Sequence, residues 1–358
     1  MTSPATGGRL RPRWWPWAGI VGALLLGGLI SGLSVAVTEG SSRLSSSTEC
    51  SATTVANDAL PSVVTISASG ASGGGTGSGE VIRRDGYILT NNHVISIAAN
   101  GGRVSVLFSQ GTTAPATIIG RDPKTDLAVI KVNESNSLPV IPFGNSRNVE
   151  IGEPVVVLGA PLGLSSTVTS GIVSALGRNI EVPSDNGNNA LLVGAIQTDA
   201  AINPGNSGGA MTDCSGRLIG VPTAGATVPN ASGQGSAGSV GLGFAIPANL
   251  AKSVSDEIIS TGRVTHSFFG ISVVPIQAAA DTAGTGQGLY VVTVTPGGPA
   301  AVAGLRTDDV ITKVDGEPAV DPNQLFALTL TKRAGDTVSI TYERNGQSAT
   351  TAVTLGSQ

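Results

Sequence analysis

The sequence predicts a mainly β protein made of two barrel-like halves and a small α+β domain, with a membrane-spanning helix near its N-terminus. Short apolar runs alternate with turn residues through the first two thirds of the chain, which favours antiparallel barrels over a parallel α/β sheet. Fifty of the 358 residues are glycine, roughly twice the ordinary usage. Only three Trp, three Tyr and six Phe are present. This composition indicates short strands joined by many turns.

Residues 18–37 predict the transmembrane helix. They carry no charge and consist mostly of Leu, Val, Ile, Gly and Ala, and a helix needs about 20 such residues to cross a bilayer. Side chains suited to the membrane surface come just before them: Arg9, Arg11, Arg13, Trp14, Trp15 and Trp17. The positive-inside rule then predicts that residues 1–17 are cytoplasmic and that the rest of the chain is extracytoplasmic.

A cleaved signal peptide is the alternative for this segment, because Ser34-Val35-Ala36 offers a cleavage site with small residues. Signal peptides usually have a shorter apolar stretch of about 7–15 residues, which favours the uncleaved anchor. The body of the protein is exported in either case. Residues 38–55 are rich in Ser and Thr, and we expect them to form a flexible stem.

Composition argues against several other kinds of function. The net charge is −4, and no basic cluster follows the three N-terminal arginines, so a nucleic-acid partner is not expected. Two histidines and two cysteines, without an HExxH or CxxC pattern, predict no dedicated metal site and no cofactor.

Residues 56–262 are predicted to form the two barrels. The strand-like runs are 63–66, 87–89, 104–107, 127–132, 154–158, 167–173, 218–221 and 242–246. A helix is expected at 248–260, with its apolar residues on one face and Gly262 ending it.

Residues 263–358 are predicted to form the α+β domain. Its expected strands are 271–274, 289–294, 310–314, 338–342 and 350–353, with a short helix at 299–303. A second helix, 322–331, should begin at Asp321 as the cap and Pro322 as the first helical residue.

The segment Gly205-Asn206-Ser207-Gly208-Gly209 contains the strongest candidate nucleophile. Glycines on both sides of Ser207 permit a tight turn and close approach of a substrate. Such a turn can direct the backbone N–H groups of Gly205 and Ser207 to one point, as an oxyanion hole requires. A serine nucleophile also needs a base and a group that orients the base.

His93 and Asp126 are the candidate base and orienting carboxylate. His93 follows the apolar run 87–89, and Asp126 directly precedes the run 127–132. The order His, Asp, Ser is that of chymotrypsin, so the three residues predict a serine protease. Asp122 and Asp199 are the alternatives to Asp126. The other histidine, His266, is expected to be a surface residue of the interdomain linker.

Several segments together resemble the HtrA/Deg family of serine proteases. In chain order they are residues 90–94, 125–129, 168–178, 197–209 and 243–247. Residues 268–271, 299–305 and 308–311 likewise resemble an HtrA-type PDZ domain. The resemblance implies a chymotrypsin-like double β-barrel protease domain at 56–262 and a PDZ domain at 263–358. It also implies endoproteolysis of misfolded or signalling proteins outside the membrane.

The resemblance assigns further site residues. The pocket-floor position of trypsin-like enzymes corresponds to Ala201, so an S1 pocket containing Ala201 and Gly243 should accept small apolar side chains. The N–H groups of Phe269, Gly270 and Ile271 correspond to the carboxylate-binding loop of the PDZ domain. A peptide C-terminus would pair with strand 271–274 beside helix 322–331. Coupling between the two domains is expected to pass through Arg178.

Three expectations depart from the family or remain open. Family members often form homotrimers, but the residues before Val63 lack the aromatic side chains that such trimers use. Cys50 and Cys214 lie outside the family pattern; in an exported domain a disulfide between them is expected, with two free thiols as the alternative. A holding chaperone or PDZ adaptor with a mostly inactive site is the rival to the protease.

Overall fold

The computed structural model describes residues 50–134, 137–160, 167–225, 239–276 and 288–357. The predicted transmembrane segment, residues 18–37, and most of the predicted stem lie outside these ranges. No helix among the described residues is long and apolar enough to cross a bilayer.

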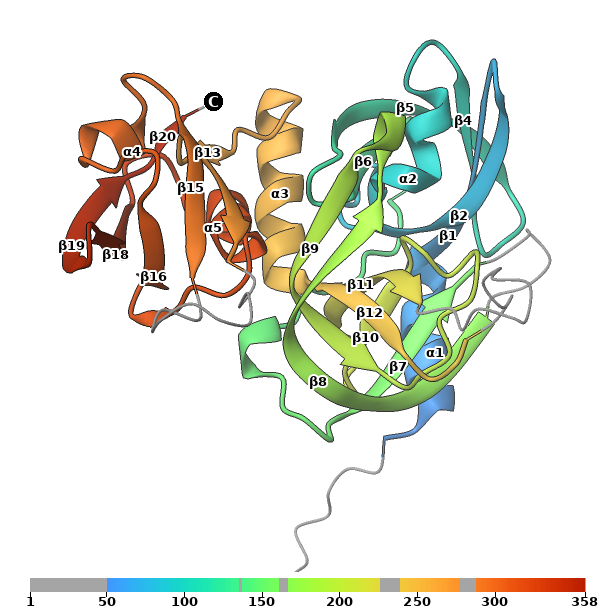
Figure 1. The fold of residues 1–358 in the computed structure, drawn as a ribbon. Coiled ribbons are helices and arrows are strands. Elements are labelled where there is room, and N and C mark those ends of the chain that lie inside the picture. Colours follow the sequence, from blue (N-terminus) through green and yellow to red (C-terminus); the bar gives the residue numbers. More distant parts are fainter. Residues whose placement is uncertain (1–49, 135–136, 161–166, 226–238, 277–287, 358) are drawn as a thin grey trace, which may run out of the picture. The chain divides into compact units, whose positions relative to one another are not determined.

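Two closed six-stranded barrels form the first domain, as the sequence predicts (Figure 1). The first barrel runs β1 (Val63–Gly70), β2 (Gly73–Val81), β3 (Tyr87–Asn91), β6 (Leu127–Val132), β5 (Thr113–Asp122) and β4 (Arg103–Leu107). The second runs β10 (Ala210–Thr212), β11 (Leu218–Gly225), β12 (Gly243–Pro247), β9 (Asn189–Thr198), β8 (Thr167–Pro183) and β7 (Pro154–Gly159). All pairings within both barrels are antiparallel.

Alternate residues of the strands face two different cores. On β3 and β6 the register pairs Ile88 with Ile130 inside the first barrel, and Leu89 with Val129 on its outer face. The outer pair packs against residues of the second barrel, including Val221. The two-residue period of a strand therefore fills the barrel and also joins it to its neighbour.

Three helices complete the first domain. α1 (Ala52–Ala59) precedes β1, α2 (Asn92–Ile95) follows β3, and α3 (Ala248–Thr261) follows β12. α3 buries Ala251, Val254 and Ile258 against both barrels and ends at Gly262, whose φ of 79° is the left-handed conformation expected of a helix-ending glycine.

The start of α1 corrects the predicted stem. Ser51 caps the helix by accepting a hydrogen bond from the backbone N–H of Thr54, at 3.2 Å. Val55 is buried in an apolar cluster that includes Val156 and Leu158 of the second barrel. Residues 52–55 are therefore helical and packed rather than part of a flexible stem. The cap and the apolar contact stabilise them, and composition alone reveals neither.

The C-terminal domain is an antiparallel sheet with two helices. Its strands lie in the order β14 (Ile271–Pro275), β15 (Leu289–Val294), β16 (Val310–Val314), β18 (Thr337–Arg344) and β19 (Gln347–Thr354), with β17 (Glu317–Pro318) beside β16. β13 (Ser267–Phe268) pairs with β20 (Gly356–Ser357), and the helices are α4 (Pro299–Val302) and α5 (Asn323–Thr331). α5 begins at Asn323, one residue later than predicted, with Pro322 rather than Asp321 at the cap position. The Asp321 carboxylate still accepts the N–H of Asn323, at 2.9 Å.

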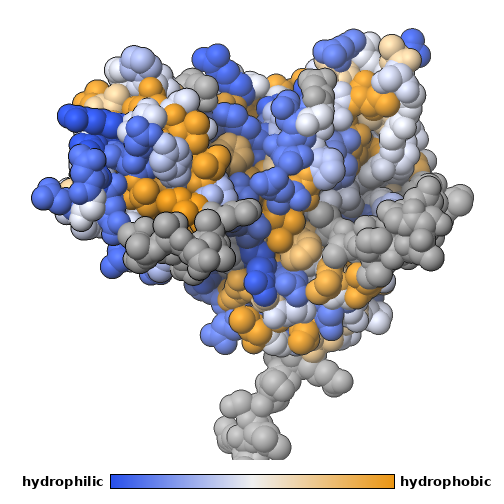
Figure 2. All heavy atoms as spheres, in the orientation of Figure 1, coloured by the Kyte–Doolittle hydropathy of each residue, from blue (hydrophilic) through white to orange (hydrophobic). Residues whose placement is uncertain are grey.

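Figure 2 shows apolar residues in several separate groups on one face, with polar residues between them. Such scattered exposure is usual for soluble domains.

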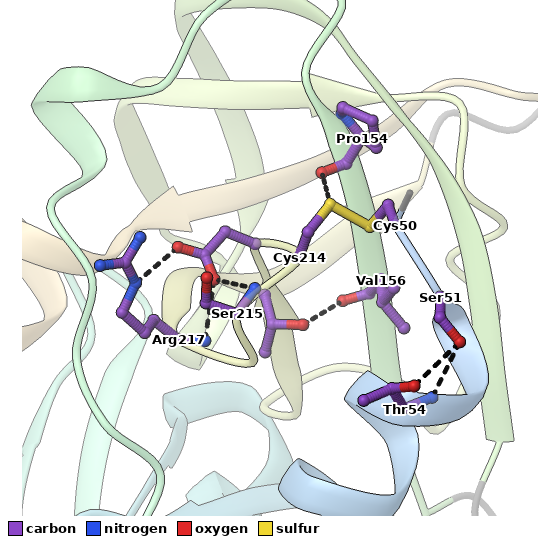
Figure 3. The surroundings of a disulfide bond; sticks show 10 residues. Cys50, Ser51, Thr54, Pro154, Val156, Cys214, Ser215 and Arg217 are labelled. Atoms are coloured by element: carbon purple, nitrogen blue, oxygen red, sulfur yellow. Dashed lines mark hydrogen bonds and ion pairs between the residues drawn. A yellow bond between two sulfur atoms is a disulfide. The ribbon is translucent and has the colours of Figure 1, made fainter. Parts of the chain in front are cut away.

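A disulfide joins Cys50 to Cys214, so the free-thiol alternative is wrong (Figure 3). It ties the segment two residues before α1 to the loop between β10 and β11, where Asp213 accepts the backbone N–H groups of Ser215 and Arg217. In the chain-entropy model, a loop of this length would stabilise the fold by about 5 kcal/mol at most.

Glu80, an ionisable residue, is buried between the two barrels. It is fully buried on β2, and its register partners, Val63 and Leu89, belong to the two apolar clusters between the barrels. Neither carboxylate oxygen has a hydrogen-bond partner among the described residues. Burial raises the pKa of Glu80 well above its usual value, and the nearby N–H dipole of its own backbone only partly offsets this.

We predict that Glu80→Leu stabilises residues 49–358. A buried polar group without a partner costs about 1–3 kcal/mol, so removing it should raise the Tm by several degrees. The wild-type protein should also lose stability as the pH rises above the ordinary glutamate value, because the unfolded chain ionises first and the folded chain retains its proton. Thermal unfolding between pH 4 and 8 measures both effects.

Glu80→Gln should remove the decrease in Tm with rising pH that is due to Glu80. The exposed Glu150→Gln variant should show the same dependence of Tm on pH as the wild-type protein. A Leu variant that is less stable than wild type at every pH would mean that the carboxyl group makes a favourable interaction.

Candidate active site

His93 and Asp126 are brought together by the pairing of β3 with β6. His93 lies in α2, directly after β3, and Asp126 directly precedes β6. The Asp126 carboxylate accepts the backbone N–H of His93 at 3.0 Å through Oδ1, and its Oδ2 lies 2.8 Å from Nδ1 of the ring. The aspartate is buried, whereas the histidine side chain is 36% exposed. The histidine is thus fixed through Nδ1 and its backbone, while its side chain stays partly exposed.

The backbone of Asp126 has an unusual conformation that is held by its neighbours. Its φ is 57°, in the left-handed region that few residues with a side chain adopt. The Asp126 carbonyl accepts hydrogen bonds from the side-chain amide of Asn91 at 2.9 Å and the backbone N–H of Asn92 at 3.0 Å. These bonds offset the cost of the strained turn and aim the carboxylate at His93.

Thr223 of β11 is a site residue that sequence reasoning missed. Its hydroxyl donates a hydrogen bond to Oδ2 of Asp126 at 2.5 Å, and its carbonyl accepts one from the Ser207 hydroxyl at 3.4 Å. Thr223 thus links Asp126 in the first barrel to Ser207 in the second. The predicted strand ended at Val221, and a threonine after a proline gives no signal of its own.

Ser207 lies in a turn held between β2 and β11. Ser78 of β2 donates its N–H to the Ser207 carbonyl at 2.9 Å and its hydroxyl to the Gly205 carbonyl at 2.6 Å. Gly208 has a φ of 79°, and a Cβ there would lie 2.4 Å from the Ser78 carbonyl oxygen, so only glycine fits. The Ser207 hydroxyl makes no hydrogen bond with His93 in this arrangement; it points to Thr223.

The two backbone groups predicted for an oxyanion hole are available. Gly205 has a φ of 99°, and neither its N–H nor that of Ser207 donates to another described residue. A hollow lined by Pro204 and by small residues of β1 and β2 lies beside Gly205. The turn therefore leaves two N–H donors without a partner among the described residues, and a hollow next to Gly205.

The alternatives to Asp126 have other partners. Asp199 accepts the backbone N–H of Ile172 at 2.7 Å. Asp122 binds Nε2 of His266 at 2.9 Å, and both side chains are buried. The prediction that His266 is a surface residue is wrong, because the partner that removes it from solvent lies far away in the sequence.

A polar network joins the second barrel to the residue before His93. Arg121 donates from Nη1 to Asp185 at 2.6 Å and to the side-chain oxygen of Asn92 at 2.8 Å. Asn92, fully buried, donates in turn to Asp185 at 3.1 Å. Asp185 lies in the turn between β8 and β9, so this hairpin contacts the start of α2.

The residues expected to form the S1 pocket lie in two neighbouring segments. The carbonyl of Ala201, which is half-buried, accepts hydrogen bonds from Thr169 and from the side-chain amide of Asn206. Gly243 begins β12, and a Cβ there would lie 2.6 Å from Cδ1 of Ile202. Gly243 is thus packed against the residue that follows Ala201.

The C-terminal domain contains a groove at the predicted place. Phe269, Gly270 and Ile271 line it at the start of β14, and Leu325 and Phe326 line it from α5. Gly270 has a φ of 84°, and the N–H groups of Phe269 and Gly270 donate to no described residue. Arg178, expected to contact this domain, is exposed on β8 and makes no side-chain bond with a described residue.

Burial and the Asp126 carboxylate act in opposite directions on His93. Burial of the ring disfavours the imidazolium, whereas the hydrogen bond and the negative charge of Asp126 favour it. The two effects of Asp126 together are stronger, and the pKa of His93 is raised above its usual value.

Comparisons with known proteins identify both domains of the chain. A family model described as a trypsin-like peptidase domain matches residues 77–221, and one described as a PDZ domain matches residues 267–355. The chain is 43% identical over 309 residues to serine protease PepD of Mycobacterium tuberculosis, covering 84% of this chain and 65% of that protein. It is 38% identical over 284 residues to a probable periplasmic serine endoprotease, DegP-like, of Rhizobium meliloti, covering 78% and 53%.

Among solved structures, an HtrA-type protease, AlgW, with a tripeptide matches with a TM-score of 0.66 and 36% identity, covering 86% of this chain and 97% of that chain. The match to the first two relatives thus spans between half and two thirds of their length, whereas the match to AlgW spans nearly all of the solved chain.

We predict that Asp126→Asn lowers the pKa of His93, because the negative charge that favours the imidazolium is lost and burial remains. NMR titration of the imidazole signals measures this directly, and His266→Gln identifies the signal of the only other histidine. Asp199→Asn is the matched control and should leave the His93 titration unchanged. An unaltered His93 pKa in Asp126→Asn would contradict the electrostatic role of this carboxylate.

Proposed function

The chain belongs to the HtrA family of trypsin-like serine proteases, and we propose that it is an endopeptidase that uses Ser207, His93 and Asp126 as its catalytic triad. The observation that carries this proposal is a chain of hydrogen bonds through all three residues: Asp126 binds the His93 ring, and Thr223 joins Asp126, through its hydroxyl, to Ser207, through its carbonyl. The relatives named as serine proteases support it.

The proposed reaction is acyl transfer. Asp126 holds the proton of His93 on Nδ1, which leaves Nε2 free to accept the proton of Ser207. The Ser207 hydroxyl must first rotate from the Thr223 carbonyl toward the ring. It then attacks the peptide carbonyl, and the N–H groups of Gly205 and Ser207 stabilise the oxyanion, each worth about 3–4 kcal/mol. His93 passes its proton to the amine that leaves as the peptide bond breaks, and a water molecule, deprotonated by His93, then hydrolyses the Ser207 ester.

The S1 pocket, formed by Ala201 and Gly243, is proposed to select small apolar side chains. No carboxylate is present at Ala201 to pair with a lysine or arginine, and a buried cation without a partner is costly.

The C-terminal domain is proposed to bind the free C-terminus of peptides by strand addition to β14. Support comes from its groove and the N–H groups of Phe269, Gly270 and Ile271. The solved AlgW structures with a tripeptide and a decapeptide support the same mode. The bound peptide is proposed to alter protease activity, to the extent that its affinity differs between active and inactive states.

We further propose an extracytoplasmic location, with residues 18–37 as a single-pass anchor. The Cys50–Cys214 disulfide supports an oxidising compartment, and a DegP-like relative is described as periplasmic. Misfolded or signalling proteins outside the membrane are the proposed substrates. Whether the protein acts as a homotrimer is left to measurement of its mass in solution.

A holding chaperone is the second candidate function. It is favoured by one observation: the Ser207 hydroxyl donates to Thr223 rather than to His93, as in a resting site.

We predict that Ser207→Ala and His93→Ala each lower the rate of casein cleavage by about 10⁴-fold or more, because the triad acts as a unit. Gel analysis of casein incubated with residues 49–358 measures this, and exposed Ser109→Ala is the matched control. Circular dichroism should be unchanged. Wild-type cleavage by Ser207→Ala would exclude the proposed nucleophile, and an inactive wild-type protein that prevents aggregation would favour the chaperone.

We predict cleavage after Val, Ala and Ile rather than after Lys and Arg. Mass spectrometry of the casein fragments identifies the residues before each cut, with the Ser207→Ala digest as the blank. Cuts mainly after basic residues would contradict the assignment of Ala201 to the pocket.

A further inference from the structure

One charged side chain from the protease domain lines the groove of the C-terminal domain. The described lining residues belong to two stretches of that domain, 267–273 and 322–329, with the single addition of Lys124. Lys124 lies in the turn between β5 and β6, two residues before Asp126. It is the only ionisable residue among those that line the groove.

Hydrogen bonds on both sides fix the Lys124 backbone. Its N–H donates to Oδ1 of Asp122 at 3.3 Å, and its carbonyl accepts the N–H of Leu191 at 3.0 Å. Asp122 also binds His266, the residue before β13. The turn is therefore tied to the segment that begins the groove.

Apolar packing between β9 and α5 also fixes the protease domain against the C-terminal domain at this turn. Leu191 of β9 is buried with Ala327 and Leu330 of α5. Glu181 of β8 also accepts a hydrogen bond from the side chain of Asn323 at 2.9 Å. Lys124 thus lines the groove as part of a packed contact between β9 and α5, rather than as an isolated surface side chain.

The Lys124 ammonium has no anionic partner in the described part of the chain. The residue is half-buried, and its neighbours in the groove are mostly apolar. A partly desolvated ammonium in such surroundings gains more from an incoming carboxylate than a fully exposed one does. The charge of the groove therefore complements an acidic ligand.

We propose that the groove binds C-terminal peptides that end in an apolar residue and carry Glu or Asp at one of the two preceding positions, with Lys124 pairing with that carboxylate. This rests on the proposed peptide binding by the domain. The N–H groups at Phe269 to Ile271 take the terminal carboxylate, and Leu325 and Phe326 receive the last side chain. The groove extends along β14 only to Val273, so it accommodates about three peptide residues.

The bound peptide then contacts both domains at once. Its backbone pairs with β14, while its acidic side chain pairs with the turn that ends at Asp126. An acidic ligand favours the packed arrangement of the two domains by the energy of that pair, whereas a neutral ligand does not. Lys124 is thus a specificity residue of a composite site.

The test measures binding, so that it does not depend on proteolysis. Fluorescently labelled octapeptides ending in Val, with Glu or Gln at the last or second-last position before it, are titrated into full-length Ser207→Ala protein. We expect the better Glu peptide to bind about fivefold more tightly than its Gln counterpart, as for a favourable partly exposed ion pair. The difference should decrease at high salt.

Variants of Lys124 identify the partner of that carboxylate. Lys124→Met should abolish the preference for Glu, Lys124→Arg should retain it, and Lys124→Glu should reverse it toward peptides with Lys at the same position. Lys313→Met, an exposed lysine of β16 outside the groove, is the matched control and should behave as wild type. Thermal unfolding of each variant checks its fold.

The outcomes distinguish the role of Lys124 from the proposed binding of C-terminal peptides, on which that role depends. Equal binding of the Glu and Gln peptides, or a Glu preference that persists in a folded Lys124→Met protein, overturns the role of Lys124 and leaves peptide binding intact. Failure of every peptide to bind, or equally tight binding of peptides with an amidated C-terminus, overturns the C-terminal peptide site itself and this proposal with it.

Discussion

The buried carboxylate of Asp126 is the interaction on which the rest of the site depends. It accepts hydrogen bonds from the His93 backbone, the His93 ring and the Thr223 hydroxyl. The first two donors belong to the first barrel and the third to the second, so this side chain fixes how α2 and β11 meet. Because the carboxylate is buried, each of these bonds is stronger than in water, and the loss of any donor would leave its charge less completely compensated.

Much of the barrel fold could be predicted from local pattern, but not all of it. Strands with β-branched residues, such as β6, were predicted with their observed bounds. β2 was missed because its sequence, GGGTGSGEV, has little strand character. Gly79 is required there, since a Cβ would lie 2.7 Å from Ile66 and 2.8 Å from Ile88. The glycine that permits close packing is thus the residue that conceals the strand.

The candidate site also has features that the sequence could predict and features that it could not. Ser207, His93 and Asp126 could be put forward as a candidate triad because only two histidines are present and the order of the three residues is informative. The hydrogen bonds of Thr223, Arg121 and His266 could not, because their partners lie far away in the sequence. His266 and Asp122 are 144 positions apart in the chain. Contacts of this kind follow from the register of two barrels and their neighbour, which no local pattern encodes.

The disulfide has a consequence for the fate of a damaged molecule. Residues 50 to 214 form one covalent loop that contains His93, Asp126 and Ser207. A cut in any peptide bond of that loop, including one made by a second copy of the enzyme, yields two fragments that remain joined through sulfur. A nicked molecule would therefore keep its apparent mass on a non-reducing gel and its connection to the N-terminal segment, and the break would become visible only after reduction.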